Sequence, residues 1–252
     1  MRLAVTGATG RMGRAVVETA AERGHEVVLA VNRDPPDEVA GVPVEPPDRL
    51  PALLAEREPD ALVDFTGPES SVAYVEACAE VGVPAVVGTT GFDDEQAARI
   101  EAAAAEVPVL RAANFARGVQ ALVRAVREAV GDLPGYDIEV TETHHNAKRD
   151  APSGTAKELL AAIEAERETG ARVHGREGEA PRQQGEVGVH ARRAGDITGE
   201  HEVLLAGNHE ALTLTHRAES RGVFAAGALD AAAWLRERDP GFYAFGDVLA
   251  DP

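Results

Sequence analysis

The 252-residue chain is poor in cysteine, lysine and aromatic residues, and it has no long apolar run. Its single cysteine, Cys78, excludes an internal disulfide and a thiolate metal cluster. The surrounding segment SVAYVEACAEVG has the pattern of an amphipathic helix, where cysteine is usually a small apolar filler, and a nucleophilic thiol is the alternative. The longest stretch without Asp, Glu, Lys or Arg runs from Val81 to Phe92, too short to cross a bilayer.

Basic residues are also scarce relative to acidic ones. The chain has 25 Lys and Arg against 43 Asp and Glu, a formal net charge of −18. Such a surface repels nucleic-acid phosphates and anionic membranes, so neither is an expected partner. A strand pattern begins at Arg2 without an apolar leader, which predicts a cytoplasmic protein. The excess of carboxylates indicates a halophilic protein from a high-salt cytoplasm, the alternative being an acidic protein from an arginine-biased genome.

The first half of the chain alternates short apolar strands with helical patterns. RLAVT (2–6) precedes a glycine turn, a helical pattern through Arg23 and the apolar run EVVLAV (26–31). The same alternation continues to PVLRA (108–112). Short β-branched runs between helices are typical of a parallel sheet covered on both faces, so residues 1–116 are predicted to form a Rossmann-like, doubly wound α/β domain.

The second half has a different pattern. GVQALVRAVREAV (118–130) has helical spacing, and four later segments alternate apolar and polar residues as half-buried strands do. Residues 117–216 are therefore predicted to form a smaller α+β domain for substrate binding and oligomerisation, with an open mixed sheet. Residues 217–252 are expected to complete the first domain. The Gly-, Glu- and Arg-rich stretch 167–184 is predicted to be a mobile surface loop.

The glycine turn predicts a dinucleotide site. Gly7, Gly10 and Gly13 follow the first strand and open the first helix, where glycine permits a tight turn and backbone N–H groups can approach a pyrophosphate. A ligand-free glycine connection is the alternative. The loops GTTG (88–91) and AANF (112–115) follow later strands and are suited to a nicotinamide and its ribose, although turn chemistry alone would also explain them.

The end of the second strand predicts the cofactor preference. A cofactor without a 2′-phosphate usually meets an acidic side chain there, but this chain has Asn32, followed by Arg33, whose guanidinium suits a phosphate. NADPH is therefore predicted to be preferred over NADH. Asp34 is close enough to replace the missing acid, which leaves NADH use open.

The window HHNAKRDAPSGTAK (144–157) holds both lysines of the chain and two adjacent histidines. Adjacent side chains of a strand point to opposite faces, so the histidines make a poor metal chelate, and no metal site is predicted. An imidazole, the Lys148 ammonium and a helix N-terminus at Gly154 and Thr155 together suit an anionic substrate beside a proton donor. A capped helix after a polar turn, with Lys148 solvated, is the alternative.

Taken together, these motifs resemble those of the 4-hydroxy-tetrahydrodipicolinate reductase family. The resemblance covers nearly the whole chain and rests on GATGRMG (7–13), DFT (64–66), GTTG (88–91), AANF (112–115), HHNAKRDAPSGTA (144–156), RAGDITGEH (193–201) and SRGVFAAGAL (220–229). It implies NAD(P)H-dependent reduction of a cyclic dicarboxylate on the diaminopimelate route to lysine, and a homotetramer assembled through the second domain's sheet. Asn32 departs from the family pattern, as does Ala116, where many members carry serine.

The resemblance also implies roles for individual residues. His144 corresponds to the acid/base residue and Lys148 to the proton donor, and His145, Gly154 and Thr155 correspond to groups that bind substrate carboxylates. The implied cofactor contacts are Gly7, Ala8, Thr9, Gly10, Arg11, Met12, Arg33, Gly88, Thr89, Thr90, Ala112, Ala113, Asn114 and Phe115.

Two other functions compete with this interpretation. A noncatalytic NADPH-binding regulator would keep the glycine turn but needs no proton donor such as Lys148. A related semialdehyde dehydrogenase needs a reactive cysteine, and Cys78 is poorly placed for that role. A short-chain dehydrogenase is excluded because no tyrosine precedes a lysine by four residues.

Overall fold

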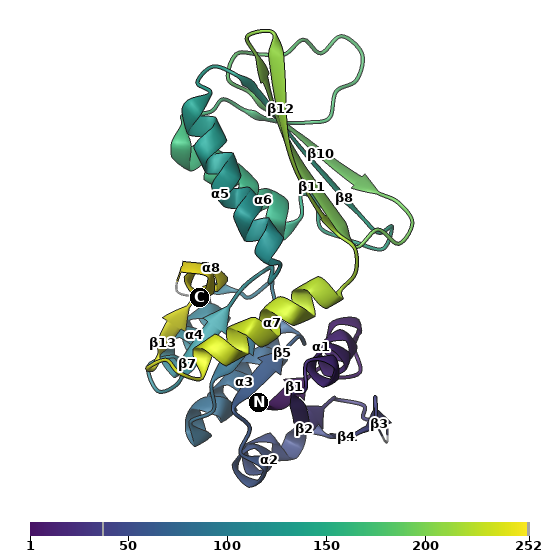
Figure 1. Ribbon diagram of the computed structural model, residues 1–252, viewed down its shortest axis with the longest axis vertical. Helices are drawn as coiled ribbons and strands as arrows, with labels where there is room; N and C mark the ends of the chain where they lie inside the picture. The colour runs from purple at the N-terminus through teal and green to yellow at the C-terminus, as the bar shows by residue number, and fades with distance from the viewer. Residues whose placement is uncertain (37, 251–252) are drawn as a thin grey trace. The chain divides into compact units, whose positions relative to one another are not determined.

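The computed structural model describes residues 1–36 and 38–250 and divides into two compact units (Figure 1). Unit 1 comprises Met1–Phe115 together with the chain from Arg221 onward, and unit 2 comprises Ala116–Ser220. Within the described residues, no helix is both long and apolar enough to cross a membrane.

Unit 1 is a doubly wound α/β fold. Its strands are β1 (Arg2–Thr6), β2 (Glu26–Val31), β3 (Glu38–Val39), β4 (Val42–Glu45), β5 (Ala61–Asp64), β6 (Ala85–Val87), β7 (Pro108–Arg111) and β13 (Gly241–Tyr243). They form one sheet in the order β13-β7-β6-β5-β1-β2-β4-β3, in which every pairing is parallel except β3 with β4. This confirms the predicted fold class.

Helices cover both faces of this sheet because successive strand residues point to opposite sides. On β1, Leu3 and Val5 join one core with α1 (Arg11–Glu22), α7 (Gly222–Leu235) and α8 (Phe245–Ala250). Ala4, between them, joins the other core with α2 (Leu50–Arg57), α3 (Pro68–Val81) and α4 (Asp94–Ala103), and a 3-10 turn (Pro47–Arg49) precedes α2. The near-continuous apolar strands follow from burial on both faces.

Cys78 is fully buried in α3, as expected for an apolar filler. Burial raises the pKa of its thiol, so the thiolate that a nucleophile requires is disfavoured.

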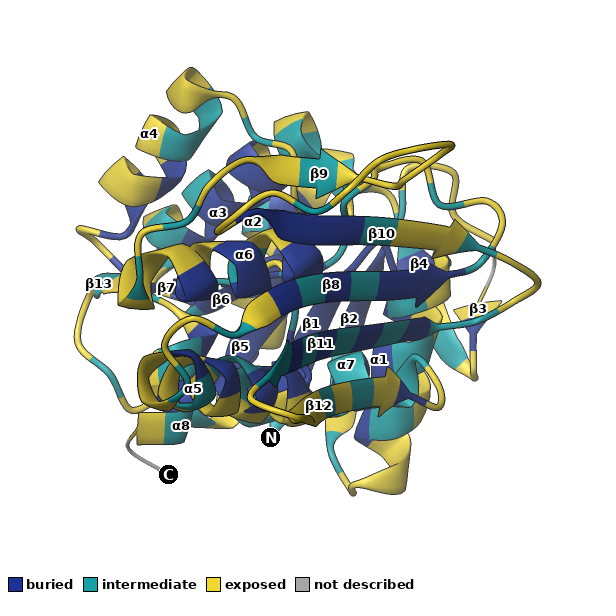
Figure 2. Ribbon diagram, turned by 90° about the horizontal axis from the view of Figure 1, so that it is seen from above, coloured by how far each residue is buried: buried dark blue, intermediate teal, exposed yellow. Residues whose placement is uncertain are grey.

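Unit 2 has one five-stranded mixed sheet covered by two helices. Its elements are α5 (Arg117–Asp132), β8 (Asp137–His144), α6 (Gly154–Glu166), β9 (Arg172–His174), β10 (Val187–Arg193), β11 (Gly199–Gly207) and β12 (Glu210–Ala218). The strand order is β12-β11-β8-β10-β9; β8, β9 and β10 are parallel, and β11 is antiparallel to β8 and β12. Ile138 and Val140 of β8 face the core formed with α5 and α6. In Figure 2 much of β8 and β10 is dark blue, whereas β12 is mostly exposed.

The stretch 167–184, predicted to be a mobile surface loop, lies at the surface but is not entirely loop. This stretch contains β9, which pairs in parallel with β10, and Arg182 contacts Asp137 and Glu139 of β8. Arg176 contacts Glu186. A three-residue strand among glycines has too little periodicity to be recognised, and the charged residues that suggested a solvated loop form ion pairs instead.

Candidate active site

In the glycine turn between β1 and α1, neighbouring backbone segments lie closer together than side chains would allow. Gly7 has φ +68, and a Cβ there would lie 2.7 Å from the Phe65 carbonyl oxygen. A Cβ on Gly13 would lie 2.1 Å from the Gly7 carbonyl oxygen, so only glycine lets α1 start against the turn. The N-cap residue is Gly10, which has no side chain that could accept from the first N–H groups of the helix. The first turn of α1 therefore offers backbone N–H groups to a phosphate, which fits a dinucleotide.

The other predicted cofactor residues follow neighbouring strands of the same sheet. Arg33 lies just after β2, exposed, and donates to Ser70 Oγ at 3.3 Å. Asn32 donates to the Asp34 carbonyl at 3.3 Å. Gly88, Thr89 and Thr90 follow β6, and Ala112 to Phe115 follow β7. Because the strands are parallel, all these segments meet at their carboxyl ends, where open α/β sheets bind ligands.

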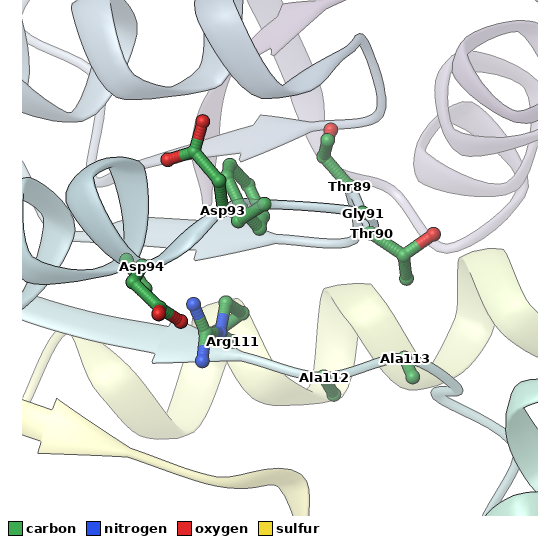
Figure 3. A pocket seen from close by; sticks show the side chains of 10 residues that line it. Thr89, Thr90, Gly91, Asp93, Asp94, Arg111, Ala112 and Ala113 are labelled. Atoms are coloured by element: carbon green, nitrogen blue, oxygen red, sulfur yellow. The ribbon is translucent and has the colours of Figure 1, made fainter.

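A cavity of about 500 Å³ opens between two of these loops (Figure 3). Thr89 to Asp94 and Ala97 line it on one side, and Arg111, Ala112 and Ala113 line it on the other. Figure 3 shows the Arg111 guanidinium beside Asp94, and the guanidinium also lies 5.5 Å from the centre of the Phe92 ring. Phe115 is 1% exposed, and its ring packs edge-on against Phe65 and Phe245, so its side chain is not available to a ligand.

In unit 2, the register of β8 brings Glu142 and His144 together. They are two residues apart on one strand and so share a face. His144 Nδ1 lies 2.5 Å from Glu142 Oε2, and Arg193 at the end of β10 donates to both Glu142 oxygens at 2.8 and 2.7 Å. The Ser153 backbone N–H also donates to Glu142, at 3.1 Å. This buried carboxylate therefore fixes the imidazole of His144, a guanidinium and the start of α6.

The electrostatics of this group favour a neutral imidazole. Burial lowers the pKa of His144, and the hydrogen bond to Glu142 opposes that shift. Burial alone would raise the pKa of Glu142, but hydrogen bonds from Arg193 and His144 hold it below its ordinary value. A neutral ring that donates from Nδ1 has its lone pair on Nε2. Gly199 leaves room there, since a Cβ would lie 3.2 Å from Nε2. His144 can therefore exchange a proton through Nε2.

A second buried histidine supports this arrangement. His201 of β11 pairs with Glu142 in the strand register and is 3% exposed. Its ring meets the His144 ring edge-on with centroids 5.1 Å apart, and its Nε2 lies 3.1 Å from Ser153 Oγ. Ser153 also accepts from the Ala156 N–H at 3.2 Å, which makes Ser153 the N-cap of α6.

His201 is expected to make folding sensitive to acid. Burial lowers its pKa from 6.5 to about 4, so between these pH values the unfolded chain binds a proton that the folded chain does not. The resulting stabilisation is complete above pH 6.5 and is lost as pH falls toward 4, a change of roughly 3 kcal/mol. Urea unfolding at neutral and acidic pH, at one salt concentration, should show a smaller loss for His201→Gln than for the wild type. The exposed His174→Gln is the control, and equal losses in all three proteins would refute the assignment.

The remaining predicted substrate residues lie close to His144 in the chain. Lys148 is half-buried, with its Nζ 2.8 Å from Asp150 Oδ1, so it is not simply solvated. His145 is half-buried, Thr155 is buried, and Gly154 at the start of α6 is exposed. Arg193 also donates to the Asp150 carbonyl at 2.6 Å, which ties this segment to β10. Within the described part of the chain, no cluster of three or more His, Cys, Asp or Glu side chains could hold a metal ion.

The predicted site residues did not include Glu142, Arg193 and His201. One signal for Glu142 was available, because it precedes His144 by two residues on a predicted strand and so had to share its face. Arg193 and His201 belong to the quoted motif RAGDITGEH, but only the sheet register places them beside Glu142.

Comparisons with known proteins identify the family. The model for "Dihydrodipicolinate reductase, N-terminus" matches residues 1–115, and the model for "Dihydrodipicolinate reductase, C-terminus" matches residues 118–249. The chain belongs to the dihydrodipicolinate reductase family. The predicted resemblance is thereby confirmed over nearly the full length.

Individual relatives agree with the family models. The 4-hydroxy-tetrahydrodipicolinate reductase of Haloarcula marismortui is 55% identical over 98% of both chains, and that of Natronomonas pharaonis is 55% identical over 99% of this chain and 100% of its own. Both organisms are halophilic archaea, in line with the acidic composition. The dipicolinate-bound dihydrodipicolinate reductase from Paenisporosarcina sp. TG-14 is 26% identical, with a TM-score of 0.78 over 97% of each chain. An amine dehydrogenase from Mycobacterium smegmatis shares the fold alone, at 16% identity and a TM-score of 0.64.

Membership of the dihydrodipicolinate reductase family makes the chain an oxidoreductase that uses a nicotinamide cofactor. A noncatalytic regulator and a semialdehyde dehydrogenase, the two open alternatives, do not account for full-length matches to both family models.

Proposed function

We propose that the chain reduces 4-hydroxy-tetrahydrodipicolinate to tetrahydrodipicolinate with NAD(P)H, with loss of water, in diaminopimelate and lysine biosynthesis. Unit 1 binds the dinucleotide, and unit 2 binds the dicarboxylate. The observation that carries the proposal is the Glu142–His144 pair, 2.5 Å apart and bordered by Arg193 and by the N-terminus of α6, in the unit matched by the family's C-terminal model. The overall reaction consumes one proton, which a side chain has to deliver.

His144 and Lys148 share the proton chemistry. Bound NAD(P)H supplies the hydride. Lys148 donates a proton from its ammonium to the ring carbon beside the one that is reduced, where negative charge develops. His144 exchanges protons through Nε2 during the loss of water, and Glu142 holds its ring and stabilises the imidazolium while it exists. Arg193 keeps Glu142 ionised by donating to both of its oxygens.

The start of α6 and His145 bind the substrate carboxylates in this proposal. The Ser153 side chain caps the Ala156 N–H, three residues further on. The helical backbone directs the N–H groups of Gly154 and Thr155 toward the N-terminus of α6, where the helix dipole favours an anion. A bound carboxylate there also polarises the ring that receives the hydride.

NADPH is the preferred cofactor in this proposal because Arg33 follows β2 where Asn32 replaces an acid. Arg33→Ala is expected to weaken NADPH binding by about tenfold or more and NADH binding far less, since only NADPH carries the 2′-phosphate. Fluorescence titration of both cofactors measures this ratio. Arg23→Ala, which removes a surface ion pair with Asp230 in the same unit, is the control. An equal loss of affinity for both cofactors would show that Arg33 does not bind the 2′-phosphate.

The uncovered face of the unit 2 sheet is proposed to join copies of the chain into a homotetramer. Leu204 and Thr215 lie on this face, opposite the side chains that pack under α5 and α6. Light scattering at high salt tests whether the protein has the mass of four chains in solution.

A coupled assay tests the proposed reaction. The substrate is generated from pyruvate and aspartate semialdehyde by the preceding synthase, and NADPH absorbance is followed after this protein is added. The expected result is consumption that requires all components. The proposal would be refuted if NADPH were consumed without the synthase. It would also be refuted if the protein bound NADPH but consumed none, which would favour a binding role.

A further inference from the structure

A buried carboxylate lies beneath the loops at the carboxyl edge of the unit 1 sheet. Asp64, the last residue of β5, is 0% exposed. Its Oδ1 accepts from Thr6 Oγ1 at 2.6 Å and from Thr66 Oγ1 at 2.7 Å. Its Oδ2 accepts from Thr89 Oγ1 at 2.8 Å and from Ser71 Oγ. Neutral hydroxyl groups thus occupy the four acceptor positions of an ionised carboxylate.

The four hydroxyls come from four different segments. Thr6 ends β1 just before the glycine turn, Thr66 follows β5, Ser71 lies in the first turns of α3, and Thr89 follows β6. The carboxylate therefore ties together three loops that follow neighbouring parallel strands. These loops include the glycine turn and the GTTG loop, which the proposed function assigns to the cofactor.

The direction of these hydrogen bonds depends on the charge. Because each hydroxyl proton points to Asp64, the oxygen lone pairs are left for other donors, and Thr89 Oγ1 accepts from the Thr66 N–H at 3.0 Å. That bond links the loop after β5 to the loop after β6. An asparagine at position 64 would present an NH2 group to two hydroxyls that now donate, which forces their protons to turn away. The side-chain volume would be kept, while one of the two acceptor oxygens would be replaced by a donor group.

The backbone around the network leaves little freedom to adjust. The space where a Cβ of Gly7 would stand is bordered by the Phe65 carbonyl oxygen at 2.7 Å and Thr66 Cγ2 at 2.9 Å. A Cβ on Gly88 would lie 2.0 Å from the Phe65 ring. A shift of the loop after β5 would therefore displace both the glycine turn and the GTTG loop.

We propose that Asp64 is a positioning residue that orients the cofactor-binding loops through the hydroxyls of Thr6, Thr66, Ser71 and Thr89. This inference rests on the proposed function only in taking those loops as the nicotinamide-nucleotide site. Asp64 itself is buried and does not contact the cofactor. It holds Thr89, which lines the 500 Å³ cavity, in one rotamer and one hydrogen-bond direction.

The test compares binding of NADPH with binding of 2′,5′-ADP, which lacks the nicotinamide half, by calorimetry and without substrate. Asp64→Asn is expected to weaken NADPH binding on the order of tenfold, the value of one to two hydrogen bonds. Binding of 2′,5′-ADP should fall less, because this ligand reaches Arg33 and the glycine turn but lacks the nicotinamide half that the GTTG loop is proposed to hold. Ser71→Ala, which removes one donor on α3, should give a smaller loss with the same selectivity. Tyr243→Phe removes a hydroxyl of β13 that donates to the Asp239 carbonyl, outside this network, and is the control.

Thermal unfolding of the same variants separates positioning from general damage. Asp64→Asn is expected to unfold at a lower temperature than the wild type, because two hydroxyl donors then face an NH2 group, but to remain folded and to lose more NADPH affinity than 2′,5′-ADP affinity. Equal loss of both ligands, or unchanged NADPH affinity, would overturn the inference. These binding measurements do not depend on turnover. A wild type that binds NADPH but does not reduce the substrate would refute the proposed function, and the role of Asp64 could still be measured. A wild type that binds neither ligand refutes both.

Discussion

Replacing His144 with alanine is expected to lower kcat by about two orders of magnitude or more and to leave the Kd for NADPH nearly unchanged. The imidazole, 2.5 Å from Glu142, is the group proposed to exchange protons with the substrate, whereas the proposed cofactor contacts belong to unit 1. Steady-state kinetics in the coupled assay and fluorescence titration of NADPH measure the two quantities.

Lys148→Ala should have an effect of the same size, because its ammonium is the proposed proton donor. The chain offers a matched control, since its other lysine, Lys157, is exposed on α6 and Lys157→Ala should behave as the wild type. Normal turnover in both His144→Ala and Lys148→Ala would refute the assignment of the proton chemistry to this window.

Glu142→Gln is expected to damage both catalysis and stability. The substitution leaves the Arg193 guanidinium, with 19% of its side chain exposed, without its carboxylate, which costs about 3 kcal/mol of unfolding free energy. It also removes the partner that favours the imidazolium of His144, so the pKa of His144 falls further. We therefore expect kcat to fall by at least about tenfold and the acidic limb of its pH profile to move to lower pH.

Two further variants separate these effects. Glu142→Gln combined with Arg193→Gln removes the unpaired cation and should recover part of the stability but not the turnover. Glu128→Gln alters an exposed carboxylate of α5 in the same unit and is the control. An unchanged pH profile in Glu142→Gln would mean that Glu142 does not tune His144.

The fold of unit 1 was predictable because its signals are local. The strand EVVLAV and the segment 2–13 carry the strand, turn and helix patterns in consecutive residues, and β2 and α1 follow them closely. The elements β3, β4, β13 and α8, and β9 in unit 2, were missed. None of them has two consecutive buried residues, whereas β5, β6 and β7 are short apolar runs that are buried along their length. The missed elements owe their conformation to pairing and packing with elements distant in the chain.

The candidate site was predictable only in part, for a related reason. His144, Lys148 and Gly154 fall in one window, so sequence spacing alone brings them together. Arg193 lies 51 residues from Glu142, and their contact depends on the parallel pairing of β8 with β10. The Asp64 network likewise joins residues up to 58 positions apart, as Thr6 shows. Residue identity gave no sign of these pairings, because strand order and register decide them.

The most direct test of the account follows the hydride itself. NADPH that carries deuterium on the transferred position of the nicotinamide is incubated with the protein and the synthase-generated substrate, and the product is examined by mass spectrometry. The account predicts tetrahydrodipicolinate that contains the deuterium, formed at a strongly reduced rate by His144→Ala. Oxidation of the labelled cofactor without deuterium in that product would contradict it.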